Sequence, residues 1–250
     1  NTQNFNSKKI NNFLHFGYKS LFKNEETFFK NINYLEKSTI VTIEKNLKIS
    51  KKKYWKLKPD NRVDQFSLKE HISNTKNLLI KAIDLRLVSD VPISLNLSGG
   101  IDSGAICSIA SKVLGKKLET FSIIDSDDRY NESDLIKITA KDCGVKNNIV
   151  RLNNKINFFD ILNKSTEYNN YPVFTITDLI HYYLSSFIKK KGFKVSLSGA
   201  GADEIYGGYY DHYLMIFREL NLSDKKKLKE YVNIWKRDIQ PNLRNKFFTK

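Results

Sequence analysis

Two glycine-rich stretches carry the residues of this chain that could do chemistry. The first is residues 98–104, Ser-Gly-Gly-Ile-Asp-Ser-Gly, which follows an alternating apolar run at 91–97 and precedes an amphipathic run at 105–114. This pattern predicts a strand, a tight turn and a helix. Free amides at a helix N-terminus favour an anion such as phosphate, to which the serine hydroxyls would add donors. Asp102 would repel a phosphate unless a cation lies between them, so the stretch predicts a magnesium-nucleotide site with Asp102 as a Mg²⁺ ligand.

The alternative interpretation of this stretch is an ordinary N-cap, because glycine turns between strands and helices are common. Two other phosphate-binding motifs are excluded, since no Gly-Lys-Ser/Thr follows and the spacing is not GxGxxG. The stretch does resemble the PP-loop, SGGxDS, of the ATP pyrophosphatases, which cleave ATP between its α and β phosphates. That resemblance implies ATP and Mg²⁺ as cofactors.

The second stretch is residues 198–209, Ser-Gly-Ala-Gly-Ala-Asp-Glu-Ile-Tyr-Gly-Gly-Tyr. Taken alone, it is typical of a flexible loop with an acidic cap for the next helix. It follows a predicted strand at 193–197, however, and ligands of parallel sheets bind beyond the C-terminal ends of the strands. We therefore expect Asp102 and Asp203 to face each other across one pocket and to share a metal ion that neutralises a departing pyrophosphate.

Strand and helix patterns alternate between and around these stretches. Further strands are predicted at 118–124 and 148–152, and helices at 67–88, 105–114, 134–143, 158–164 and 177–190. Residues 131–134 resemble a cap for the helix at 134–143, and Ser67 with Glu70 forms a predicted capping box for the helix at 67–88. Four apolar residues of the helix at 67–88 are predicted to lie in the core: Ile72, Leu79, Ile83 and Leu87. The alternation predicts an α/β fold, a doubly wound parallel sheet with right-handed crossovers.

The chain's composition limits the class of protein. At 250 residues with 40% hydrophobic residues, the chain is long enough to bury a full core. It has no apolar run long enough to span a membrane and no signal peptide, so we expect a cytoplasmic protein. Cys107 and Cys143 lack metal-site spacing and are expected to be inert buried thiols. The net charge of +15 comes largely from scattered lysines, which are typical of solvated surface, so we do not expect a nucleic-acid partner.

Together, SGGIDS and SGAGADEIYGGY resemble the synthetase domain of the glutamine-dependent asparagine synthetases and their relatives, including β-lactam synthetase. The resemblance implies an ATP-dependent carbon-nitrogen ligase: a carboxylate attacks the α-phosphorus, giving an acyl-adenylate and pyrophosphate, and ammonia then displaces AMP. It implies Asp102, Asp203 and Glu204 as catalytic residues, the two aspartates as the Mg²⁺ ligands. The implied ATP contacts are Leu97, Ser98, Gly99, Gly100, Asp102, Ser103, Ile123, Ser198 and Gly199.

The same resemblance implies a division of the chain into domains. Residues 1–57, β-rich in their second half, loosely resemble the tail of a class II amidotransferase glutaminase domain. Residues 58–66 are the expected linker, and residues 67–250 the synthetase domain, which the resemblance implies continues further. Glutamine-derived ammonia is expected from a glutaminase domain missing from these residues. The sequence leaves the oligomeric state open, a homodimer included.

Two departures from the family pattern leave the acceptor open. Aspartate is the default by resemblance, but Ala200 stands where asparagine synthetases usually carry Glu, and Asn170-Tyr171-Pro172 where they carry Asp-Glu-Pro. A methyl and a phenol cannot supply the charge of those carboxylates, so another carboxylate, such as a sugar acid, is an alternative acceptor. Two further alternatives are an RNA-modifying PP-loop ligase, which the net charge favours, and a non-catalytic ATP-binding remnant.

Overall fold

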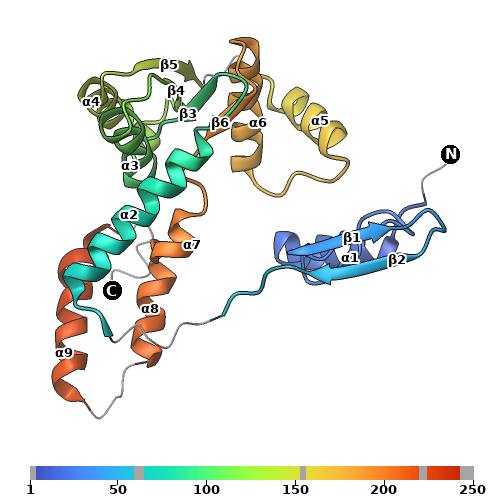
Figure 1. Ribbon diagram of the computed structural model, residues 1–250, viewed down its shortest axis with the longest axis horizontal. Helices are drawn as coiled ribbons and strands as arrows, with labels where there is room; N and C mark the ends of the chain where they lie inside the picture. The colour runs from blue at the N-terminus through green and yellow to red at the C-terminus, as the bar shows by residue number, and fades with distance from the viewer. Residues whose placement is uncertain (1–3, 59–64, 153–155, 220–223, 243–250) are drawn as a thin grey trace. The chain divides into compact units, whose positions relative to one another are not determined.

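Four short strands form the sheet from which both glycine-rich stretches emerge. The computed structural model describes all residues except 1–3, 59–64, 153–155, 220–223 and 243–250, and gives the strand order β5-β4-β3-β6 (Figure 1). The strands are β3 (Ile93–Asn96), β4 (Glu119–Ile124), β5 (Lys146–Arg151) and β6 (Val195–Leu197). β3 and β6 run parallel, with Ile93 opposite Val195 and Leu95 opposite Leu197. The parallel sheet confirms the predicted α/β class.

The helices before β6 follow the predicted order, and local sequence explains several helix ends. They are α2 (Leu68–Arg86), α3 (Ile101–Ser108), α4 (Ser133–Cys143), α5 (Phe158–Asn169), α6 (Ile176–Lys190), α7 (Ala202–Tyr206), α8 (Tyr210–Glu219) and α9 (Lys225–Ile234). The capping box of Ser67 and Glu70 is present at the start of α2. α4 ends at Gly144, whose φ of 62° is left-handed, a conformation that glycine adopts without steric cost.

The predicted core face of α2 is only partly correct. Ile83 is buried and Leu79 and Leu87 are half-buried, but Ile72 is 61% exposed. Helical spacing places these four residues on one stripe, but it does not show how far along the helix that stripe is covered. Among the described residues, the side chains that bury this stripe do not extend to the first turns of α2.

The chain divides into two compact units. The first comprises Asn1–Pro92, Phe121–Asn131 and Asn148–Lys194, and the second comprises Ile93–Thr120, Glu132–Asn147 and Val195–Lys250. In the first unit, α6 packs on the sheet through a cluster of buried side chains: Phe121, Val150, Leu184 and Ile188. The second unit contains β3, α3, α4, β6 and α7, and therefore both glycine-rich stretches.

The N-terminal part of the first unit is a helix followed by a hairpin. α1 (Ser7–Phe16) precedes β1 (Thr39–Ile43) and β2 (Ile49–Lys53), which pair antiparallel with Ile43 opposite Ile49. Every residue of β2 is exposed. Lys9 of α1 is buried, where its Nζ donates to the carbonyl oxygen of Leu21 at 2.6 Å, and burial lowers its pKa. The hairpin confirms the prediction of a β-rich N-terminal segment.

No helix among the described residues combines the length and the apolarity needed to cross a bilayer.

Candidate nucleotide-binding site

The first glycine-rich stretch joins β3 to α3 in a loop closed by its own serines. Ser103 is buried, and its Oγ accepts from the Ser98 amide at 3.1 Å. The same hydroxyl lies within donating distance of the carbonyl oxygens of Ser98 (3.1 Å) and Gly100 (3.2 Å). Ser98 Oγ accepts from the Gly100 amide at 3.2 Å. The loop is therefore held in one conformation by the two hydroxyls that the sequence suggested as phosphate donors.

The N-terminus of α3 lacks a side-chain cap. Gly100 is its N-cap residue, and no side chain accepts a hydrogen bond from the first turn there. The first amides of a helix have no partner within the helix and carry the positive end of its dipole. Asp102 lies in this first turn, half-buried. This end of α3 is therefore suited to hold an anion, with a carboxylate beside it for a cation.

The second glycine-rich stretch packs directly against this end of α3. A Cβ built on Gly199 would lie 2.9 Å from Asp102 Cβ and 3.0 Å from the Ser103 amide nitrogen. Carbon atoms in contact are ordinarily about 3.5–4.0 Å apart, so only glycine fits at position 199. Two segments almost a hundred residues apart in sequence thus meet at the helix N-terminus.

The carboxylates of the second stretch are held by the turn that ends α7. A Cβ on Gly208 would lie 1.7 Å from Asp203 Oδ1, so this carboxylate oxygen occupies the space that glycine leaves free. Glu204 is exposed and accepts from the Tyr209 hydroxyl at 2.9 Å, a hydrogen bond that raises the pKa of Tyr209. Both acidic side chains are thus oriented by glycine and tyrosine of the same loop.

The structure brings together some of the predicted site residues and not others. Leu97 is buried at the end of β3, and the loop 98–103 meets Gly199, as described above. Ser198 Oγ accepts from the Ala200 amide at 3.4 Å. Ile123 lies in the first unit, where it packs against the core cluster of Phe121. Its role in holding ATP stays a prediction.

The donor set fits Mg²⁺ held jointly with a nucleotide. The described residues contain no group of three or more His, Cys, Asp or Glu side chains that could hold a metal by themselves. Mg²⁺ at nucleotide sites is usually bound through one or two carboxylates, with phosphates and water completing the octahedron. Asp102 and Asp203 are two carboxylates from adjoining stretches, and their sharing of one Mg²⁺ ion stays a prediction.

One contact of the loop was not predicted. Glu132 lies at the N-cap position of α4, within the segment 131–134 expected to cap that helix, but no side chain caps it. The prediction of a cap there is wrong. Glu132 Oε2 instead accepts from the Gly99 amide at 2.9 Å, so the carboxylate is committed to the glycine loop. The acidic residue was visible in the sequence, but nothing local indicated its partner 33 residues away.

The departure at 170–172 has a structural explanation. Asn170 ends α5 in the left-handed conformation, with φ of 56°, which asparagine tolerates better than most residues with a Cβ. The Tyr171 ring stacks on Phe174 at a centroid distance of 4.9 Å, and Phe174 contacts the rings of Phe13 and Phe22. These residues join the segment to the N-terminal part of the same unit.

Comparisons with known proteins find a matching family and several relatives for most of this chain. The family described as Asparagine synthase matches residues 74–248. A putative glutamine-hydrolysing asparagine synthetase of Methanocaldococcus jannaschii is 28% identical over 197 residues, 74% of this chain and 36% of the relative. Asparagine synthetase 1 of Bacillus subtilis is 30% identical over 73% of this chain and 28% of the relative. Amidase chyE of Penicillium rubens is 25% identical over 73% of this chain and 30% of the relative. The chain thus spans about a third of the length of these curated relatives.

Two solved structures are also similar. An NH3-dependent NAD synthetase of Campylobacter jejuni has a TM-score of 0.36 at 15% identity, covering 58% of this chain and 61% of that one. An NMN synthetase of Francisella tularensis has a TM-score of 0.37 at 18% identity, covering 58% of this chain and 59% of that one.

Proposed function

Because the chain belongs to the asparagine synthase family, we propose that it uses ATP to turn a carboxylate into an amide. A carboxylate oxygen of the acceptor attacks the α-phosphorus of ATP, the bond to the β-phosphate oxygen breaks, and pyrophosphate leaves. The product is an acyl-adenylate. Ammonia then attacks the acyl carbon, AMP departs, and the amide loses a proton to solvent.

The observation that carries this proposal is the contact of Gly199 with the first turn of α3. It brings a second acidic loop to an uncapped helix N-terminus that already bears Asp102. The amides at a helix N-terminus bind phosphate oxygens. The helix dipole is already oriented, so no protein groups need to reorient when negative charge develops on the departing pyrophosphate. Catalysis of pyrophosphate departure depends on such preorganised positive charge. The loop 98–103 is held closed by its own hydrogen bonds, so these amides are in place before a ligand arrives.

Asp102 and Asp203 are the residues that would hold Mg²⁺ in this proposal. Mg²⁺ bound with ATP neutralises charge on the phosphates. The task of the chain's own residues is to fix the nucleotide: the α3 amides hold phosphate oxygens, and the tight approach of Gly199 leaves no room for the second loop to shift. Glu204 stands next to Asp203 and is steadied by Tyr209.

The acceptor is a carboxylate, with aspartate the first candidate. Ala200 and Asn170 replace carboxylates that asparagine synthetases carry, so the proposal extends to other carboxylic acids, including sugar acids. Asn170 serves as the left-handed end of α5, which accounts for its presence without a role in binding the acceptor. Glutamine hydrolysed in a separate glutaminase domain is the proposed source of ammonia.

The experiment is a pyrophosphate-release assay with ATP, Mg²⁺, ammonia and a panel of carboxylic acids. We expect release with at least one acid, and a loss of about a hundredfold or more in turnover in Asp102→Asn and in Asp203→Asn. Asp134→Asn is the matched control, because its carboxylate is exposed and pairs only across the surface with Lys137. Full activity in either site variant would contradict the assignment, and no AMP with any acid would favour a non-catalytic ATP-binding protein.

The net charge of +15 favours one alternative, a PP-loop ligase that adenylates a tRNA base. Electrostatic RNA binding weakens steeply with salt, because bound counterions are released. Binding of tRNA that persists at physiological salt, with tRNA-dependent AMP formation, would support this alternative. The absence of binding at that salt concentration would dispose of it.

A further inference from the structure

Glu132 directs its carboxylate to the glycine loop and not to its own helix. It occupies the N-cap position of α4, where a side chain ordinarily accepts from the helix's first amides. Its Oε2 accepts instead from the Gly99 amide at 2.9 Å. A charged acceptor makes this a stronger bond than an ordinary one between neutral groups. One side chain thus links the start of α4 to the loop before α3.

The fit between Gly99 and α4 shows that this link is built into the packing. A Cβ on Gly99 would lie 2.8 Å from Glu132 Cβ and 3.1 Å from Leu135 Cβ. Both separations are shorter than ordinary carbon-carbon contact, and both obstructing atoms are Cβ atoms, which cannot move without the backbone. Gly99 is therefore required by its contact with α4. The close approach also brings the Glu132 carboxylate within reach of the amide.

The hydrogen bonds of the loop explain what this link achieves. Three consecutive amides are taken up by side chains: Ser98 by Ser103 Oγ, Gly99 by Glu132, and Gly100 by Ser98 Oγ. The first turn of α3, by contrast, has no side-chain cap. The loop amides are thereby already hydrogen-bonded, whereas the first turn of α3 keeps amides without a side-chain acceptor. Of the three acceptors, only Glu132 comes from outside the loop.

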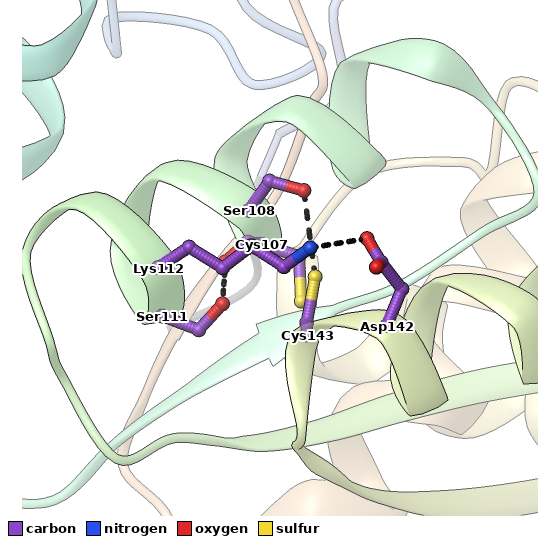
Figure 2. A network of polar contacts seen from close by, with 6 residues as sticks. All are labelled: Cys107, Ser108, Ser111, Lys112, Asp142 and Cys143. Carbon is purple, nitrogen blue, oxygen red and sulfur yellow. Dashed lines mark hydrogen bonds and ion pairs between the residues drawn. The ribbon is translucent and has the colours of Figure 1, made fainter.

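α4 also contacts the end of the α3 segment at its far end. Lys112 Nζ, in the π-helical turn after α3, lies 2.6 Å from Asp142 Oδ2 (Figure 2). Ser108 Oγ and Cys143 Sγ are 3.4 Å apart in the same region, which Figure 2 also shows. α3 and α4 are thus joined both at the Gly99 loop and near their C-terminal ends.

We propose that Glu132 is a positioning residue for the nucleotide: by holding the Gly99 amide, it fixes the loop so that the uncapped amides of α3 can receive phosphate oxygens. This inference rests on the proposed function in taking a nucleotide as the ligand. The feature that matters most is an acceptor oxygen at this position; the negative charge strengthens the hydrogen bond but is not needed to form it. The role differs from that of Asp102, whose carboxylate would bind the proposed metal ion.

The test compares Glu132→Gln, Glu132→Ala and the control Asp134→Asn. Glutamine keeps an acceptor oxygen, so Glu132→Gln should bind Mg-ATP within about threefold of the unaltered protein. Loss of the acceptor in Glu132→Ala should weaken Mg-ATP binding about tenfold, the usual effect of losing one such hydrogen bond. The KM for ATP should rise by a similar factor, with a smaller change in kcat. Asp134→Asn removes the same charge from the same turn of α4 and should change none of these values.

Hydrogen exchange of the loop without nucleotide provides an independent measurement. The amides of residues 98–100 should exchange about tenfold or more faster in Glu132→Ala than in the unaltered protein, while urea unfolding midpoints report whether the variant is folded. Equal exchange and equal ATP binding would overturn the inference. If Glu132→Gln bound Mg-ATP as weakly as Glu132→Ala, the charge would be the requirement and the inference would be wrong. It would also be wrong if Glu132→Ala bound Mg-ATP more tightly than the unaltered protein, because the carboxylate would then compete with phosphate. If the unaltered protein binds no ATP, the proposed function fails, and the exchange data still decide whether Glu132 orders the loop.

Discussion

Gly199→Ala tests the junction of the two glycine-rich stretches most directly. The added methyl would lie 2.9 Å from Asp102 Cβ, 3.0 Å from the Ser103 amide nitrogen and 3.3 Å from the Asp102 carbonyl carbon. Against an ordinary separation of roughly 3.5–4.0 Å, the stretches must part by about 0.6 to 1 Å. Two of the three obstructing atoms are backbone, so the first turn of α3 or the loop 198–201 must move as a whole.

Overpacking of this kind costs about 1–3 kcal/mol of stability. The larger effect is expected on catalysis, because a displacement of roughly 1 Å in positioning groups can cost about a hundredfold in rate. We therefore expect turnover in the pyrophosphate assay to fall by about ten- to a hundredfold, with weaker Mg-ATP binding. The urea unfolding midpoint measures the stability term separately.

Gly104→Ala is the matched control for this substitution. It lies in the same helix α3, and its added methyl would meet only Thr139 Cγ2 at 3.8 Å, an ordinary contact. Alanine is favoured over glycine inside a helix by about 1 kcal/mol, so this variant should be at least as stable as the unaltered protein and as active. If Gly199→Ala binds ATP and turns over like Gly104→Ala, the junction does not position the nucleotide and our reasoning about the site is refuted.

Three further predictions concern the supporting structure. Burial raises the pKa of the Cys107 thiol to about 12, so Cys107 should not react with a thiol reagent at pH 8 until the protein is unfolded; rapid labelling of Cys107 in the native protein would contradict this. Ser67→Ala should cost about 1 kcal/mol in urea unfolding at pH 7. The pKa of its partner Glu70 is lowered from 4.5 by hydrogen bonds from Ser67, so the part of the effect that involves the Glu70 carboxylate is present above pH 4.5 and is lost as the pH falls through the lowered pKa; a cost independent of pH would be the contrary result. Asn170→Val should destabilise the protein by about 1–2 kcal/mol in urea unfolding, because a β-branched side chain is strained in the left-handed conformation. Asn170→Gly should not destabilise it, and equal urea unfolding midpoints for the two variants would show that Asn170 is kept for another reason.

The sequence predicted the elements of the site because their signals are local. The alternation before Ser98, the glycines and the helical period after Gly104 lie within some twenty residues of each other, and they predict the strand, the turn and the helix in the right order. The helix itself begins at Ile101, inside the predicted turn, and continues as a π-helical turn after Ser108. The capping box of Ser67 and Glu70 is local in the same sense. Each depends on hydrogen bonds between residues close in the chain, which residue types alone can specify.

The sequence could not predict contacts that depend on which elements become neighbours. Glu132 was expected within a helix cap, and its carboxylate instead holds an amide of a loop that precedes α3. Ile72 carries the same periodicity as Ile83, yet it remains exposed, because periodicity does not report where a neighbouring element ends. The fit of Gly199 against Ser103 likewise follows from the pairing of β3 with β6, which no local pattern contains.

The ring contacts of Phe174 have a practical consequence for anyone preparing a shortened protein. Phe13 and Phe22 cover part of this ring from the N-terminal side of the first unit. Cutting the chain in the region of residues 58–66, to express the C-terminal part alone, would remove these two rings and expose more of Phe174 and of Tyr171, which stacks on it. Such a fragment should be less soluble, and its behaviour in the assays proposed above would partly reflect the lost aromatic contacts.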